Sequence, residues 1–315
     1  MGRAVDFARR GRVRARPSSK DLHVTMTPGQ LATRPFTAAD LSFGLWLTEQ
    51  AGWNQTPDDW LRAYELEPDG AFVAQVDGHD AGVVTTCTFG TVAWIALLLV
   101  APNMRSRGAG KLLLDTALDR LERLSIPSVR LDATPLGQPL YEQRGFVADF
   151  TMIRFAGRVT AANLREDRPS TEFSLGDMTD DLLAEALAID RAVIGVDRAK
   201  LVERLYRLAP QAARILKTAG RTVGYVFARP GRTARHIGPC ASLDPLAGRA
   251  LLREAITRHD GENVFADIPA DNSAACELAR DAGLVEQRRL VRMTRGLSQP
   301  ESPLAMWAGS GPEKG

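Results

Sequence analysis

The stretch LLLVAPNMRSRGAGKLLL, residues 97–114, decides the fold of this chain. It starts inside an apolar run, residues 94–100, that is typical of a buried strand, and it ends where apolar residues begin to recur at helical spacing. The backbone N–H groups in the first turn of a helix lack partners within the helix, and the helix dipole favours an anion there. The polar turn between strand and helix therefore predicts a phosphate-binding loop. Its candidate binding residues are Arg105, Arg107, Gly108, Ala109, Gly110 and Lys111.

Two better-known phosphate loops do not fit this turn. A P-loop requires glycine five residues before Gly110 and Ser or Thr two residues after it, where the chain has Arg105 and Leu112. A dinucleotide fingerprint requires a third glycine at the position of Leu113. The pattern that remains is R-x-x-G-x-G, and it resembles the acyl-CoA diphosphate loop of the GNAT superfamily of N-acyltransferases.

A second motif follows an expected short strand at residues 129–132. Residues 139–146 read P-L-Y-E-Q-R-G-F and resemble the other GNAT signature, L-Y-x-x-x-G-F, on a short helix before the last strands. The order of loop, helix, strand and tyrosine motif is that of the family, and the resemblance covers roughly residues 31–155. It implies an α/β fold of the α+β mixed-sheet kind, in which a twisted sheet is flanked by helices.

The resemblance also implies acetyl-CoA as the co-substrate. In GNAT enzymes the end of the fourth strand splays from the fifth, and its backbone pairs with the pantetheine arm like an added strand. This places Leu98, Leu99 and Val100 along the cofactor. Thr134 stands where many relatives have an asparagine that contacts the same arm, and the departure leaves that contact open.

Amide formation from a thioester needs a proton for the departing thiolate and a base for the amine. Tyr141 is the candidate acid, because a phenol, whose pKa is ordinarily about 10, can protonate a thiolate, whose pKa is about 8.5 if cysteine is a guide. A purely structural tyrosine is the alternative. Many GNAT enzymes have a glutamate on the fourth strand, but residues 94–100 contain no acid, so Asp132 is the nearest candidate base. The alternative for Asp132 is a cap of Thr134 and the following turn.

The region between the first and second strands usually forms one wall of the acceptor site in GNAT folds. Here it contains Trp53, Asn54 and Gln55, an aromatic side chain and two amides that suit a small, polar, partly apolar acceptor. A loop in which Trp53 only plugs the core is the alternative.

The second half of the chain repeats this plan weakly. Residues 272–284 echo the tyrosine motif with Ala279 in the place of the tyrosine, and residues 240–248 lack the R-x-x-G-x-G pattern and carry an acid. This resembles the second GNAT-like domain of a tandem-GNAT group, and it implies a half that binds no CoA and helps to form the acceptor site. The resemblance also places Asp197 and Arg198 near the acceptor, with a helix cap and a surface ion pair as the alternative.

The sequence thus predicts two GNAT-like domains with connecting segments. Residues 1–21 carry seven basic and two acidic side chains, which is typical of a disordered leader or an upstream start; a nucleic-acid arm or presequence is the alternative. The tail is expected to be loose, with Met306 and Trp307 as a candidate anchor. The expected segments are a leader (1–28), a catalytic GNAT domain (29–157), a linker (158–170), a degenerate GNAT-like domain (171–297) and a tail (298–315).

Composition and charge narrow the function. The chain has 315 residues, 44% of them hydrophobic and 25% charged, and its net charge of +2 is too small to argue for a nucleic-acid partner. No run of 18 apolar residues predicts a membrane span, and three widely spaced cysteines indicate a reduced, cytoplasmic protein without a metal site. We expect a monomeric or homodimeric N-acetyltransferase that acts on a primary amine of a small molecule. A non-catalytic acyl-CoA-binding or sensory protein and a protein lysine acetyltransferase are the alternatives.

Overall fold

The computed structural model describes residues 30–164 and 173–312, so the predicted leader and residues 165–170 of the predicted linker lie outside it. The N-terminal half contains β1 (Leu31–Pro35), α1 (Leu41–Gln50), α2 (Pro57–Leu66), β2 (Ala71–Val76), β3 (His79–Phe89), β4 (Val92–Val100), α3 (Ala109–Arg123), β5 (Ser128–Ala133), α4 (Gln138–Glu142) and β6 (Val147–Arg158). The C-terminal half contains β7 (Phe173–Asp177), α5 (Leu183–Ile194), α6 (Ala199–Leu208), β8 (Arg214–Thr218), β9 (Arg221–Arg229), β10 (Arg235–Ser242), α7 (Pro245–Thr257), β11 (Asn263–Pro269), α8 (Ser273–Asp281), β12 (Val285–Gly296) and β13 (Met306–Ala308).

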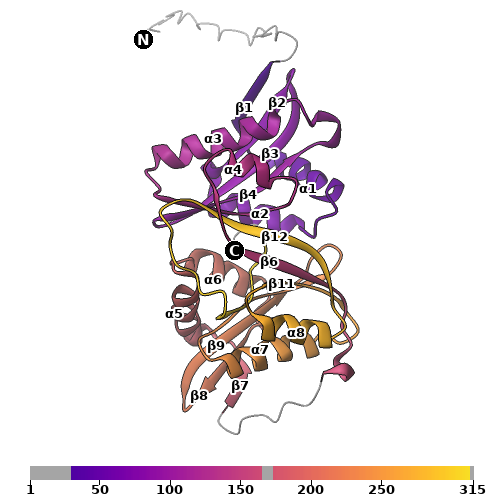
Figure 1. Cartoon of the computed structure of the whole chain (residues 1–315), viewed down its shortest axis with the longest axis vertical. Helices are drawn as coiled ribbons and strands as arrows, with labels where there is room; N and C mark the ends of the chain where they lie inside the picture. Colours follow the sequence, from indigo (N-terminus) through magenta and orange to yellow (C-terminus); the bar gives the residue numbers. More distant parts are fainter. Residues whose placement is uncertain (1–29, 165–172, 313–315) are drawn as a thin grey trace, which may run out of the picture.

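One mixed sheet runs through both halves, which are stacked along the long axis of the molecule (Figure 1). Among the described residues it has 13 strands in the order β1-β2-β3-β4-β5-β12-β6-β11-β10-β9-β8-β7, with β13 paired to β10 off this path. The order is palindromic, because each strand of one half has a counterpart at the same distance from the centre in the other. The mixed α/β fold with two similar halves that the sequence predicts is confirmed.

The two halves exchange their last long strands. β12 pairs with β5 and β6, and β6 pairs with β12 and β11, so that each of these strands completes the sheet of the other half. Figure 1 shows β12 crossing the middle of the molecule beside β6. The segment boundaries predicted from the sequence stay a prediction, but the exchange brings side chains of the C-terminal half next to β5.

Helix α3 covers one face of the N-terminal sheet. It packs on β2, β3 and β4 through Leu113, Leu114, Ala117 and Leu121, which recur at helical spacing and are 0–1% exposed. This packing fixes the start of α3, and with it the R-x-x-G-x-G turn, at the end of β4.

The two halves also share one apolar core at their junction. Trp94 of β4 belongs to the same buried cluster as Tyr225 of β9, Leu290 of β12 and Met306 of the tail. Met306 and Trp307 are each 1% exposed, so the predicted anchor is confirmed and the expectation of a loose tail is wrong for this segment. A shared core of this kind joins the halves into one body.

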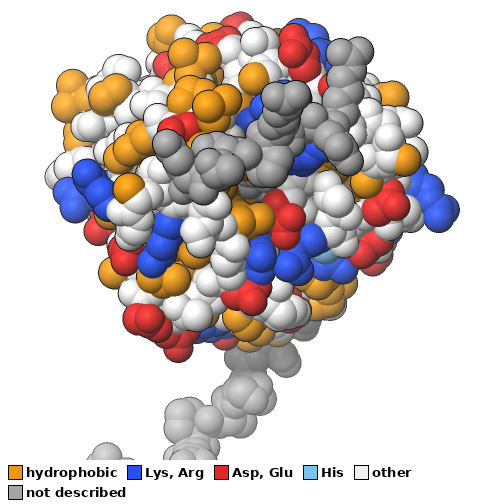
Figure 2. Space-filling view, turned by 90° about the horizontal axis from the view of Figure 1, so that it is seen from below, with side chains coloured by type: hydrophobic (Ala, Val, Ile, Leu, Met, Phe, Trp, Pro, Cys, Tyr) orange, Lys and Arg blue, Asp and Glu red, His pale blue; other side chains and the backbone are white. Residues whose placement is uncertain are grey.

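The surface and the helices of the described chain add two observations. Figure 2 looks onto the end of the C-terminal half and shows acidic and basic side chains interspersed over that face rather than gathered by sign. None of the described helices combines the length and the hydropathy that a membrane span requires.

Candidate active site

Strands β4 and β5 separate after a short parallel pairing. They pair from Val92↔Ser128 to Trp94↔Arg130, and no described strand pairs with this edge of β4 beyond that point. On its other edge β4 has a bulge against β3, where Leu97 takes a positive φ of 50°. The bulge bends β4 away from β5, and the open edge of β4 faces a cavity.

This cavity has about 560 Å³ of space between protein atoms, part of it open to solvent. The N-terminal half supplies most of the wall, while Arg288 and Leu290 come from the exchanged β12 and Pro312 from the tail. The full lining is Trp53, Gln55, Ile95, Ala96, Leu97, Leu98, Leu131, Asp132, Thr134, Tyr141, Arg288, Leu290 and Pro312.

The predicted phosphate loop lies at the far end of β4. Gly108 has a φ of 88° at the N-cap of α3, and no side chain caps the helix there. Arg105 and Arg107 are exposed on the turn; the Nε of Arg105 donates to the carbonyl of Val100 at 3.4 Å. An uncapped helix N-terminus flanked by guanidinium groups is suited to bind a diphosphate.

Gly110 leaves room over the first turn of α3. Its φ is not in the left-handed region, and a Cβ there would make only ordinary contacts, 3.6 Å from Val100 Cγ2 and 3.9 Å from Leu98 Cδ2. The fold itself would therefore accept alanine, whereas a diphosphate lying on the backbone needs the space that glycine leaves. The turn and the open β4 edge fit the acyl-CoA that the resemblance implies.

The other predicted cofactor residues follow the same path. Leu98 and Thr134 line the cavity, while Leu99 and Val100 pair with Val83 and Gly82 of β3 and carry β4 on toward the turn. Ala109 is buried at the start of α3, and Lys111 is exposed.

Tyr141 enters the cavity from α4. The residue is 9% exposed, and its ring packs edge-on against Phe146, with 6.0 Å between the ring centroids. Burial raises the pKa of the Tyr141 phenol to about 12. The phenol therefore keeps its proton at neutral pH, as a proton donor must.

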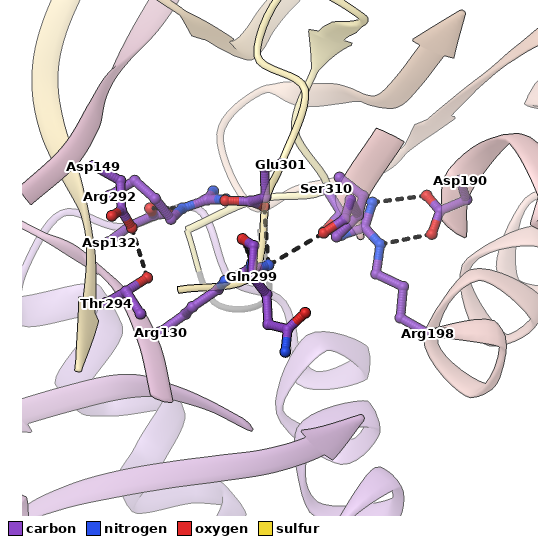
Figure 3. A network of polar contacts seen from close by, with 11 residues as sticks. Arg130, Asp132, Asp149, Asp190, Arg198, Arg292, Thr294, Gln299, Glu301 and Ser310 are labelled. Atoms are coloured by element: carbon purple, nitrogen blue, oxygen red, sulfur yellow. Dashed lines mark hydrogen bonds and ion pairs between the residues drawn. The ribbon is translucent and has the colours of Figure 1, made fainter. Parts of the chain in front are cut away.

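Asp132 lines the cavity but is held by an arginine of the exchanged strand. Its Oδ1 and Oδ2 accept hydrogen bonds from Nε and Nη2 of Arg292 at 2.6 and 3.1 Å. Arg292 also donates to Glu301 at 2.8 and 2.9 Å (Figure 3). Its guanidinium carbon lies 4.4 Å from the centre of the Trp94 ring. Burial raises the pKa of the Asp132 carboxyl, and Arg292 opposes that effect.

The same ion pair occurs at the matching place in the C-terminal half. Asp267 of β11 accepts from Nε and Nη2 of Arg154 on β6 at 2.7 and 2.6 Å. That half has no tyrosine at the motif, yet it keeps the pair. The recurrence favours a structural role for both pairs, in which they join the exchanged strands, and Asp132 as the base stays a prediction.

The three predicted acceptor residues of the N-terminal half have different surroundings. Trp53 and Gln55 line the cavity, and the Trp53 ring lies 5.8 Å from the guanidinium carbon of Arg288. Asn54 instead binds the other half: its Oδ1 accepts the N–H groups of Thr233 and Ala234 at 2.8 and 3.1 Å, and its Nδ2 donates to the Ala234 carbonyl at 2.8 Å. Its side chain joins the two halves rather than facing the cavity.

Asp197 and Arg198 do not line the cavity. Asp197 is exposed and accepts the N–H of Ala199 at 2.9 Å, an Asx turn just before α6, whose N-cap residue is Arg198. Arg198 is 2% exposed and bonds both oxygens of Asp190 at 2.9 Å (Figure 3). A surface ion pair between Asp197 and Arg198 is therefore absent: Asp197 forms a surface turn, and Arg198 is buried against Asp190.

Sequence reasoning missed four residues of the site: Arg288, Leu290, Arg292 and Pro312. Three of them reach the cavity region through the exchanged strand, which the order of predicted elements does not reveal. One signal was available, because each half has an aspartate at the end of its fifth strand and an arginine in its last long strand, Asp132 with Arg154 and Asp267 with Arg292.

Known proteins resemble both halves. Residues 39–146 match the model of the acetyltransferase (GNAT) family, and residues 186–305 match that of an acetyltransferase (GNAT) domain. The uncharacterized N-acetyltransferase YitH of Bacillus subtilis (strain 168) is 24% identical over 234 residues, which are 72% of this chain and 78% of that protein.

Two solved structures share the fold along most of the chain. A Pyrococcus horikoshii protein with an acetyltransferase assignment has a TM-score of 0.75 at 20% identity and covers 94% of this chain and 100% of its own. A tandem GNAT protein from the clavulanic acid biosynthesis pathway has a TM-score of 0.59 at 14% identity and covers 86% of this chain and 100% of its own. Fold and family matches together define a protein of the acyltransferase class. The chain belongs to the GNAT superfamily of N-acetyltransferases and carries two GNAT domains.

Proposed function

We propose that the N-terminal half transfers an acetyl group from acetyl-CoA to a primary amine of a small molecule. The observation that carries the proposal is one continuous path: the uncapped turn at Gly110, the open edge of β4, and the cavity that holds Tyr141. A donor bound along this path would bring its acyl end to the cavity.

The residues of the path have separate tasks in this proposal. The first turn of α3, with Arg105 and Arg107, holds the diphosphate, and the β4 edge orients the arm. Bound acetyl-CoA supplies the acetyl thioester. Tyr141 holds a proton toward the sulfur, and Trp53 and Gln55 face the acceptor.

A small acceptor is favoured because residues of both halves wall the cavity, including Arg288 of β12. The C-terminal half then completes the acceptor site without binding a second acetyl-CoA. A protein lysine would have to enter between two joined halves.

One observation favours a second candidate, a protein that binds acyl-CoA without transferring the acyl group. Asp132 is the one acid among the lining residues, and both of its oxygens are bonded to Arg292. Such a protein would have the acyl-CoA-binding turn and β4 edge but no base for the amine.

Native mass spectrometry with acetyl-CoA tests whether the chain binds the cofactor, and a panel of small amines tests whether it transfers the acetyl group. We expect one acetyl-CoA bound per chain and its loss in Gly110→Asp, where a carboxylate would repel the diphosphate. Acetylation of at least one small amine supports the enzyme. Bound cofactor with no acetylated amine supports the binder, and no bound cofactor at millimolar concentration refutes both.

A further inference from the structure

The gap between β10 and β11 in the C-terminal half is filled by the chain itself. These strands pair over a short stretch that ends at Ile237↔Ala266, as their counterparts β4 and β5 do. Beyond that point β13 pairs with β10 in antiparallel orientation, and the N–H of Gly309 donates to the carbonyl of Asp267 on β11 at 2.7 Å. The strand β13 therefore occupies the place that corresponds to the open β4 edge.

Side chains close the rest of this second gap. Trp307 lies directly on Gly248, the counterpart of Gly110 in the first turn of the following helix, so closely that a Cβ on Gly248 would overlap the indole. Asp244 caps the same helix, because its Oδ1 accepts the N–H groups of Leu246 and Ala247 at 2.8 and 3.0 Å. The groups that would meet a diphosphate are thus covered by an indole and a carboxylate of the same chain.

Asn272 fastens the segment from the other side. Its Nδ2 donates to the carbonyls of Leu304 and Met306 at 3.2 and 3.1 Å, and the N–H of Ser242 on β10 donates to the carbonyl of Ala305 at 3.0 Å. The backbone of the segment is therefore bound as an added strand would be. Hydrogen bonds from both backbone and side-chain groups therefore hold the segment in the gap between β10 and β11.

The segment is continuous with the acceptor cavity at both of its ends. Upstream, Glu301 accepts from Arg292 at 2.8 Å, and Arg292 holds the cavity residue Asp132 (Figure 3). Downstream, Pro312 lines the cavity itself. The segment docked between β10 and β11 therefore fixes the positions of Glu301 and Pro312 at the acceptor cavity of the N-terminal half.

We propose that residues 304–309 are an intramolecular stand-in for acyl-CoA in the C-terminal half, and that their docking positions the acceptor wall of the N-terminal half. The part that concerns acceptor binding rests on the proposed function. Trp307 is then a positioning residue: it touches neither donor nor acceptor and acts through Pro312 and Glu301.

The test compares Trp307→Ala, Trp307→Phe and Leu304→Ala in the full chain. Leu304 lies in the same segment but is 69% exposed, which makes it the matched control. We expect Trp307→Ala to raise the KM for the amine about 10-fold, the factor that a lost contact of about 1.4 kcal/mol gives, with the acetyl-CoA Kd within twofold of wild type. Trp307→Phe should recover most of the loss, and Leu304→Ala should change neither constant.

Hydrogen exchange of residues 302–312 is the second readout, and it does not depend on turnover. Trp307→Ala should speed exchange there at a temperature where the rest of the chain stays protected. Faster exchange with an unchanged amine KM would overturn the positioning role. Unchanged exchange would overturn the docking itself. If no amine is acetylated by any variant, the proposed function fails, and the stand-in is then judged by exchange alone.

Discussion

Tyr141 and Asp132 line the same cavity, yet their surroundings prepare them for different tasks. An acid needs a proton that it keeps until charge develops next to it, whereas a base needs an accessible lone pair. The Tyr141 phenol keeps its proton at neutral pH, which meets the first need; burial raises its pKa to about 12, so it gives up that proton only to a strongly basic thiolate. Arg292 bonds both oxygens of Asp132, which does not meet the second.

Replacing Tyr141 by Phe removes the proton and keeps the ring. We expect kcat to fall about 10²-fold or more, the range of general acid catalysis, while the acetyl-CoA Kd stays near that of wild type. In the wild type, the phenol loses its proton only as the pH rises through about 12, so we expect no alkaline loss of kcat from Tyr141 near pH 9. Steady-state kinetics over pH measures both. A phenylalanine variant with unchanged kcat would leave Tyr141 a structural role.

Asp132→Asn and Asp267→Asn form a matched pair for the base. Each variant takes one carboxylate from a buried pair, since the side chains of Asp132 and Asp267 are 2% and 3% exposed, and should lose about 3 kcal/mol of unfolding free energy. If the pairs are structural, the two variants behave alike, and Asp132→Asn keeps most of its turnover at temperatures where it is folded. A loss of turnover of 10²-fold in Asp132→Asn alone, at wild-type stability, would instead identify the base. Chemical denaturation and kcat/KM decide between them.

At the scale of elements, the strand–turn–helix unit occurs once in each half, and the start of its helix differs between the two. In the N-terminal half α3 begins without a side-chain cap, and a Cβ on Gly110 would make only ordinary contacts. In the C-terminal half Asp244 caps α7 and Trp307 covers Gly248. One unit is therefore able to receive a ligand, and the other has its place taken by the chain.

Gly110→Ala and Gly248→Ala should distinguish the helix start that binds acetyl-CoA from the one that Trp307 covers. At Gly110 a Cβ meets only ordinary contacts, so stability should stay within about 0.5 kcal/mol of wild type while acetyl-CoA binds at least several-fold more weakly. At Gly248 a Cβ overlaps Trp307, so we expect a loss of about 1–3 kcal/mol, the usual range for overpacking, with little change in the acetyl-CoA Kd. Thermal unfolding and cofactor titration are the measurements. A loss of stability in Gly110→Ala together with weaker acetyl-CoA binding in Gly248→Ala would contradict the proposal that only the N-terminal half binds acetyl-CoA.

At the scale of the molecule, the sequence predicts the fold of each half better than it predicts how the two halves are joined. The R-x-x-G-x-G turn and the Tyr141 motif are local patterns, so the first fold and its loop could be read from residues that are close in sequence. The strand exchange could not, because the residues of β6 and β12 do not show in sequence which of the two sheets each strand completes. For that reason the sequence does not place Arg288 and Leu290 at the cavity, and it favours an acceptor role for Asn54, whose side chain joins the halves.

The exchange itself predicts how the molecule unfolds. β12 cannot leave the N-terminal sheet without exposing the edges of both β5 and β6, and β6 cannot leave without exposing β11. The shared core around Trp94 and Tyr225 would open in the same event. We therefore expect the two halves to unfold in one cooperative transition rather than as separate domains.

Native-state hydrogen exchange at increasing denaturant measures this cooperativity. Peptides from β3 and β4 and peptides from β9 and β10 should approach the same opening free energy, with the same dependence on denaturant, because only global unfolding frees either group. Exchange in the C-terminal peptides through an opening several kcal/mol below the N-terminal one would show that the halves unfold independently. The exchanged strands would then be a contact between separately stable domains, and the second half could move against the acceptor cavity instead of holding its wall in place.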